Sequence, residues 1–82
     1  MKKQYFVQAH GYLERALFYE YVHNKFKIKD GYRDKEYMCH SKYPFVIDLK
    51  EKYIYLLESI TSCAMAAQNN KIINVEEFKE RV

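Results

Sequence analysis

Two short apolar segments, Phe45–Leu49 and Tyr53–Leu57, constrain the fold more than any other part of the chain. Both are rich in aromatic and β-branched side chains, which is typical of β-strands. The three charged residues Lys50–Lys52 separate them, a length that suits a hairpin loop even without the glycine that such loops usually carry. We therefore predict an antiparallel hairpin whose first strand begins directly after Pro44.

The N-terminal part predicts one strand and one ambiguous segment. Gln4–Ala9 reads as a strand that ends at His10 and Gly11. Residues 12–24 contain Leu13, Leu17 and Tyr21 at i, i+4 and i+8, which favours a helix. The aromatic and β-branched residues 18–22 also suit a strand. We predict the helix; a long strand here would instead give an all-β meander with a helical tail.

The middle of the chain predicts a second hairpin. Lys25–Lys29 alternates, with three lysines on one side and Phe26 and Ile28 on the other. Asp30-Gly31 is a strong turn signal, which makes Tyr32–Met38 the predicted return strand and residues 39–42 a loop.

Helices are predicted toward the C-terminus. Ser59 is a suitable cap for a helix that runs to Asn69-Asn70. Its apolar stripe comprises Leu57, Ile60, Ala64 and Ala67, with Cys63 beside it. Ile72-Ile73 is predicted to be a short link. Asn74 and Glu77 form a capping-box pattern for a last helix through Phe78 to about Arg81.

The order of these elements defines the expected fold class. No alternating β-α-β pattern is present, and 82 residues are the size of one domain. We predict that residues 1–82 form a single compact α+β domain. It would contain a small antiparallel β-sheet with two or three helices packed on one face.

Composition limits the environment and the partners. The hydrophobic share is 49%, which is typical of ordered domains, and the formal net charge is only +3. No apolar run approaches the roughly 18 residues of a membrane span, and the two cysteines are too few for a disulfide scaffold. We expect a cytoplasmic protein with free thiols and no membrane association. Abundant Lys, Ile, Asn, Tyr and Phe fit an AT-rich source, such as a low-GC bacterium or its phage.

Candidate catalytic and metal-binding residues are few. Cys39 and His40 are adjacent while His10 and Cys63 stand alone, and this spacing does not match the paired ligands of zinc sites. Two glycines are little material for an oxyanion loop or a phosphate cradle. We therefore expect no catalytic residues, no metal and no cofactor. A thiol centre at Cys39 and His40 is the enzymatic alternative.

The basic and aromatic segment 25–43 is the candidate for nucleic-acid binding. Aromatic platforms interleaved with cations are used by proteins that bind single strands. The alternative interpretation is that lysines on an edge strand prevent aggregation between sheets. The residues in question are Lys25, Lys27, Lys29, Arg33 and Lys35.

The tyrosines suggest a protein-binding surface. Nine tyrosines cannot all be buried in so small a core. If Ile54 and Leu56 face the core, Tyr53 and Tyr55 point outward, and tyrosine is enriched at interfaces. We predict a small non-catalytic module that docks on a larger protein, or on its own copy, through Tyr53, Tyr55, Tyr32 and Tyr37. With a phage source, such a module could be an inhibitor or adaptor of a host protein.

Overall fold

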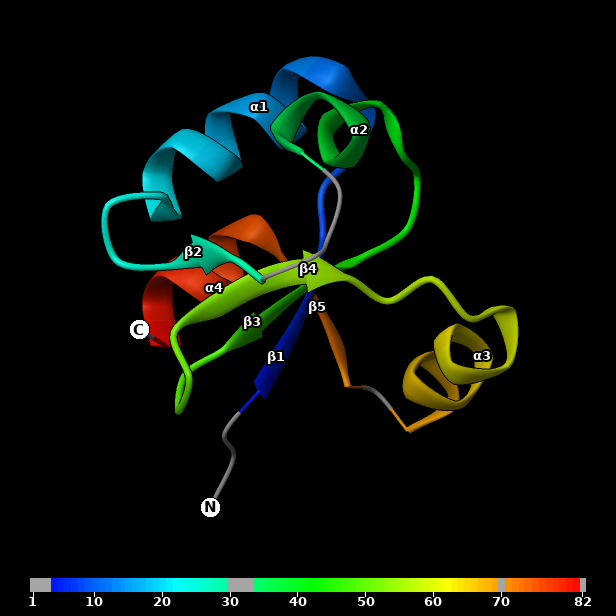
Figure 1. Ribbon diagram of the computed structural model, residues 1–82. Coiled ribbons are helices and arrows are strands. Elements are labelled where there is room, and N and C mark those ends of the chain that lie inside the picture. The colour runs from blue at the N-terminus through cyan, green and yellow to red at the C-terminus, as the bar shows by residue number, and fades with distance from the viewer. Residues whose placement is uncertain (1–3, 30–33, 70, 82) are drawn as a thin grey trace.

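Five strands form one mixed sheet in the order β2-β4-β3-β1-β5 (Figure 1). The structure is a computed structural model that describes residues 4–29, 34–69 and 71–81. Four helices accompany the sheet within these ranges. The elements are β1 (Gln4–Gln8), α1 (Gly11–Val22), β2 (Lys27–Ile28), α2 (Lys35–His40), β3 (Phe45–Asp48), β4 (Tyr53–Leu56), α3 (Ile60–Gln68), β5 (Ile72–Asn74) and α4 (Val75–Arg81).

Parallel and antiparallel pairs both occur in the sheet. β3 pairs antiparallel with β1 and with β4, while β5 runs parallel to β1 and β2 runs parallel to β4. The α+β class is therefore confirmed, but the sheet is mixed and not wholly antiparallel. The difference has two sources: the predicted link at Ile72-Ile73 is a strand, and β2 pairs with β4 instead of with residues 32–38.

The predicted return strand Tyr32–Met38 is wrong from residue 34 onward. Asp34 is the N-cap of α2, and its carboxylate accepts a hydrogen bond from the Tyr37 backbone N–H at 3.0 Å. Met38 and Cys39 are both buried, as neighbours on a helix can be and alternating strand residues are not. Asp30, Gly31 and Tyr32 lie outside the described residues.

The β3–β4 hairpin is confirmed, and its loop shows how it folds without glycine. The Asp48 carboxylate accepts hydrogen bonds from the backbone N–H groups of Lys50 and Glu51, both at 3.0 Å. These bonds lower the pKa of Asp48, the Glu51 bond most strongly. Lys52 adopts φ 62°, the left-handed conformation that glycine usually supplies.

The core lies between one face of the sheet and helices α1, α2 and α4. Phe18 of α1 contacts Phe45 and Phe78, with ring centroids 5.3 and 5.4 Å apart. Figure 1 shows α1 and α2 side by side above the sheet, while α3 stands apart from the other helices. The core residues are Val7, Ala9, Phe18, Val22, Phe26, Met38, Phe45, Ile47, Ile54, Leu56, Ile73 and Phe78.

The predicted caps of the last two helices are present. The Ser59 hydroxyl accepts a bond from the Ser62 N–H at 3.2 Å, and Asn74 Oδ1 accepts one from the Glu77 N–H at 2.7 Å. In α3 the predicted apolar stripe is wrong, because Ala64 and Ala67 are exposed and Ala66 is buried. No described helix has the length and apolar character needed to cross a bilayer.

Candidate functional site

The most unusual surface of the molecule is an apolar stripe on the outer side of α1. Leu13, Leu17 and Tyr21 are 72%, 63% and 50% exposed, and we call these three residues the α1 stripe. An apolar stripe on a surface helix normally faces the core. Here the predicted helix is confirmed, but Arg15, Phe18 and Val22 on its other side are the buried residues.

Arg15 holds this orientation of α1. Its side chain is 1% exposed, and it donates hydrogen bonds to the Met38 carbonyl at 2.9 Å and the Ala9 carbonyl at 3.0 Å. The guanidinium carbon lies 4.4 Å from the centre of the Phe45 ring, and burial lowers the pKa of Arg15. A guanidinium thus links α1 to the end of β1 and to α2, and the leucines are left outside.

Charged side chains border the α1 stripe on both sides. On the side of α2, Glu20 forms an ion pair with Lys35 at 2.6 Å, and this contact lowers the pKa of Glu20. On the side of α4, the Lys79 ammonium lies 4.9 Å from the centre of the Tyr21 ring. Glu14, next to Leu13, accepts a hydrogen bond from the His10 backbone N–H. The apolar stripe therefore has a polar rim, as docking surfaces do.

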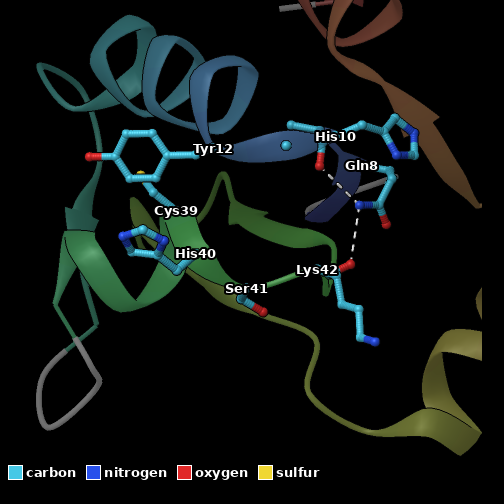
Figure 2. Close-up of a pocket in the computed structure, with 9 residues that line it drawn as sticks. Gln8, His10, Tyr12, Cys39, His40, Ser41 and Lys42 are labelled. Atoms are coloured by element: carbon cyan, nitrogen blue, oxygen red, sulfur yellow. Dashed lines mark hydrogen bonds between the residues drawn. The ribbon is translucent and has the colours of Figure 1, made fainter.

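A cavity of about 470 Å³ lies where β1 leads into α1, beside the end of α2 (Figure 2). It brings together three residues singled out in the sequence, His10, Cys39 and His40. Figure 2 shows Tyr12 and His40 on one side of the cavity and Gln8, His10 and Lys42 on the other. The amide of Gln8 spans its wall by donating to the carbonyls of Ala9 at 3.1 Å and Lys42 at 3.3 Å.

The groups in this cavity do not form an activated nucleophile. Cys39 is buried, and desolvation raises the pKa of its thiol, which disfavours the reactive thiolate. The Tyr12 hydroxyl donates to Glu36 at 3.1 Å, and this carboxylate raises the pKa of Tyr12. His40 lies 3.5 Å from the other Glu36 oxygen. Among the described residues, no group of three His, Cys, Asp or Glu could hold a metal ion.

The outer face of the sheet carries two of the four predicted docking tyrosines. Tyr53 and Tyr55 alternate with the buried Ile54 and Leu56, so they point away from the core as predicted. Both are half-buried. The Tyr55 hydroxyl accepts a bond from the Gln4 amide at 3.2 Å, and Lys29 lies 4.8 Å from the centre of its ring.

Of the other two predicted tyrosines, the described one, Tyr37, does not extend this face. Tyr37 lies on α2, where its hydroxyl donates to the Glu58 carboxylate, and Tyr32 is outside the described residues. The residues thus do not combine into one tyrosine-rich surface in the described part of the chain.

The predicted nucleic-acid-binding lysines are also divided. Lys27 is opposite Tyr53 in the β2–β4 pair, and Lys29 lies near Tyr55, so these two accompany the sheet tyrosines. Lys25 is exposed before β2, whereas Lys35 lies on α2 and pairs with Glu20. Arg33 lies outside the described residues.

The sequence predicted the helical spacing of the α1 stripe but not the exposure of its residues. The signal was present, since apolar residues occupy most sides of residues 12–22 and only one side can face the core. Comparison with protein-family models, curated proteins and solved structures gives no match. A functional proposal therefore depends on the surfaces of this molecule alone.

Proposed function

We propose that this protein is a small non-catalytic protein-binding module that docks through the α1 stripe. The observation that carries the proposal is the exposure of Leu13 and Leu17, at 72% and 63%, on one face of a helix. Two leucines and a tyrosine at i, i+4 and i+8 are the pattern by which a helix binds an apolar groove. Scattered exposed leucines are common, whereas adjacent ones inside a charged rim favour an interface.

The α1 stripe supports docking better than the tyrosines of the sheet. Tyr53 and Tyr55 are half-buried and less exposed than Tyr21, and the hydroxyl of Tyr55 already has a partner in Gln4. The Leu17 side chain has no polar group. A partner that covers it therefore removes apolar surface from water without breaking a hydrogen bond to water. Binding through Tyr53 and Tyr55 stays a separate prediction, as does a role as inhibitor or adaptor of a host protein.

A matched pair of substitutions tests the proposal. Leu17→Asp places a charge in the middle of the α1 stripe, while Met65→Asp makes the same kind of change at a side chain of α3 that is 57% exposed. We expect a tagged wild-type protein to retain a protein partner when it is chemically crosslinked in a nuclease-treated lysate that also contains untagged copies of the chain. Leu17→Asp should lose this partner and Met65→Asp should keep it, with unchanged circular dichroism for both. Equal retention by all three proteins would contradict docking through α1.

The second candidate function is binding of single-stranded nucleic acid through the outer face of the sheet. It is favoured by one observation: Lys27 and Lys29 accompany Tyr53 and Tyr55 on β2 and β4, so cations and rings share an edge. We expect a fluorescent oligothymidylate to bind with an affinity that falls steeply as salt increases. Lys27→Glu combined with Lys29→Glu should abolish this binding. Absence of binding at low salt would remove this candidate.

A further inference from the structure

We propose that the α1 stripe binds a second copy of this chain, with the two α1 helices antiparallel across a two-fold axis at Leu17. This inference rests on the proposed function and names the partner of that surface. It is drawn from the symmetry of the stripe and from the charges beside it.

The α1 stripe is complementary to itself in the antiparallel direction. Leu13 and Tyr21 lie four residues before and after Leu17, which places them at equal distances, about 6 Å along the axis at 1.5 Å per residue. A two-fold axis at Leu17 therefore brings Leu13 against the partner's Tyr21, and Leu17 against the partner's Leu17. Figure 1 shows α1 above the sheet beside α2, and the exposed Leu13 and Leu17 lie on its outer side.

The charges on the α4 side of the stripe match the same arrangement. At 100° per residue, Glu14 lies about 60° from Leu17, on the same side of the helix as Phe18. Phe18 contacts Phe78, and the neighbouring Lys79 lies 4.9 Å from the Tyr21 ring, so Lys79 borders that side too. The two-fold rotation places the α4 sides of both copies on the same side of the dimer. It also sets the N-terminal end of one α1 helix against the C-terminal end of the other. Lys79 at one end then meets the partner's Glu14, and symmetry repeats the pair.

The charges on the α2 side do not oppose this pairing. Glu20, which borders the stripe there, already forms an ion pair with Lys35 of its own chain. A parallel pairing would instead turn the α4 side of one copy toward the α2 side of the other, which separates Lys79 from the partner's Glu14, and it would align the two helix dipoles. The charges of the described residues thus favour the antiparallel arrangement.

The size of the stripe predicts a weak dimer. Three side chains of this size contribute on the order of 300 Å² of apolar surface per copy. The pair therefore covers less than the roughly 1,200 Å² of a stable interface. We expect a dissociation constant on the order of 10⁻⁵ to 10⁻³ M, with monomers at low micromolar concentration.

Charge reversal at Glu14 and Lys79 tests the geometry by sedimentation equilibrium. Glu14→Lys and Lys79→Glu should each weaken dimerisation about tenfold, because two attractive pairs become repulsive. An equimolar mixture of the two variants should associate, since each heterodimer contains two attractive pairs. The double variant should also dimerise. Restoration in the mixture and in the double variant separates loss of the pair from damage to the fold.

Three outcomes would overturn the inference. The first is a wild-type protein that stays monomeric at millimolar concentration. The second is a dimer that is insensitive to both single substitutions. The third is single variants that weaken association, with no recovery in the mixture or the double variant.

The two proposals can fail separately. If the wild type is monomeric but Leu17→Asp still loses a lysate partner that Met65→Asp keeps, the partner is another protein and only the inference fails. If the wild type is monomeric and no capture depends on Leu17, both proposals fail. Dimerisation that is lost with Leu17→Asp and follows the charge pattern supports both.

Discussion

Helix α1 and the β3–β4 hairpin both have apolar residues on two faces, and they divide these faces differently. In the hairpin, the buried aliphatic residues Ile54 and Leu56 alternate with the half-buried Tyr53 and Tyr55. In α1, a buried arginine holds the helix, and leucines face the solvent. The hairpin therefore presents amphipathic tyrosine rings on its outer face, while α1 exposes apolar side chains to water. We infer that the hairpin serves the fold and that the outer side of α1 serves binding.

The largest expected effect contrasts two neighbours in α1. Phe18→Ala should lower the free energy of unfolding by about 3–5 kcal/mol, because a buried ring is removed from the core. Leu17→Ala should change it by less than about 0.5 kcal/mol, since this side chain is already in water. Urea denaturation at low micromolar concentration measures both in the monomer. Similar losses for the two variants would mean that the leucine side of α1 is buried.

Replacing Arg15 tests what holds α1 in place. Arg15→Met keeps much of the volume but removes the donors to the Met38 and Ala9 carbonyls. We expect a loss of about 1–2 kcal/mol, because the Met38 carbonyl loses a charge-assisted hydrogen bond in a buried position. The same denaturation experiment measures it, and Lys79→Met provides an exposed control. An unchanged or increased stability would show that the arginine is not the anchor.

A smaller effect is expected in the hairpin loop and depends on pH. The pKa of Asp48 is lowered in the folded state, so its contribution is present above the unfolded pKa of about 3.9 and is lost as pH falls through the folded pKa. Asp48→Asn should cost about 0.5–1 kcal/mol at pH 7. The two proteins should converge as pH falls below the folded pKa of Asp48. Denaturation curves from pH 7 to pH 2 give the difference, and a gap independent of pH would contradict it.

The smallest expected effect is a gain. Lys52 has φ 62°, a conformation in which side chains other than glycine are strained, so Lys52→Gly should stabilise the hairpin by about 0.5 kcal/mol. Lys50→Gly is the matched control in the same loop, where no positive φ is present and a small loss is expected. A loss at Lys52 equal to the loss at Lys50 would argue against relief of strain.

The predictions succeeded where a local rule decides the structure. Alternation over Tyr53–Leu56 is enough to assign the two sides of a strand, and Ser59 and Asn74 cap helices through bonds made within four residues. Helix α2 was missed because Asp34 and Glu36 have the spacing of a polar strand face. Strand β5 was missed because three residues become a strand only when a distant partner, β1, is present.

The candidate site was only partly predictable for a similar reason. The period of Leu13, Leu17 and Tyr21 indicates a helix, but which side faces inward depends on the carbonyls that Arg15 reaches at Ala9 and Met38. These acceptors lie directly after β1 and on α2, and no pattern within α1 reveals them. The outward direction of Tyr53 and Tyr55 was predictable, and their partial cover by Gln4 and Lys29 was not.

The parallel pairing of β1 with β5 has a consequence for how the protein is made. β1 is translated before β5, so one of its two neighbours does not exist until residues 72–74 have been added. At about 5–20 residues per second, β1 waits several seconds with an open hydrogen-bonding edge. During synthesis that edge is available to other nascent chains. The sheet is therefore completed only after residues 72–74 have been translated, and chaperones that shield β1 would act before β5 appears.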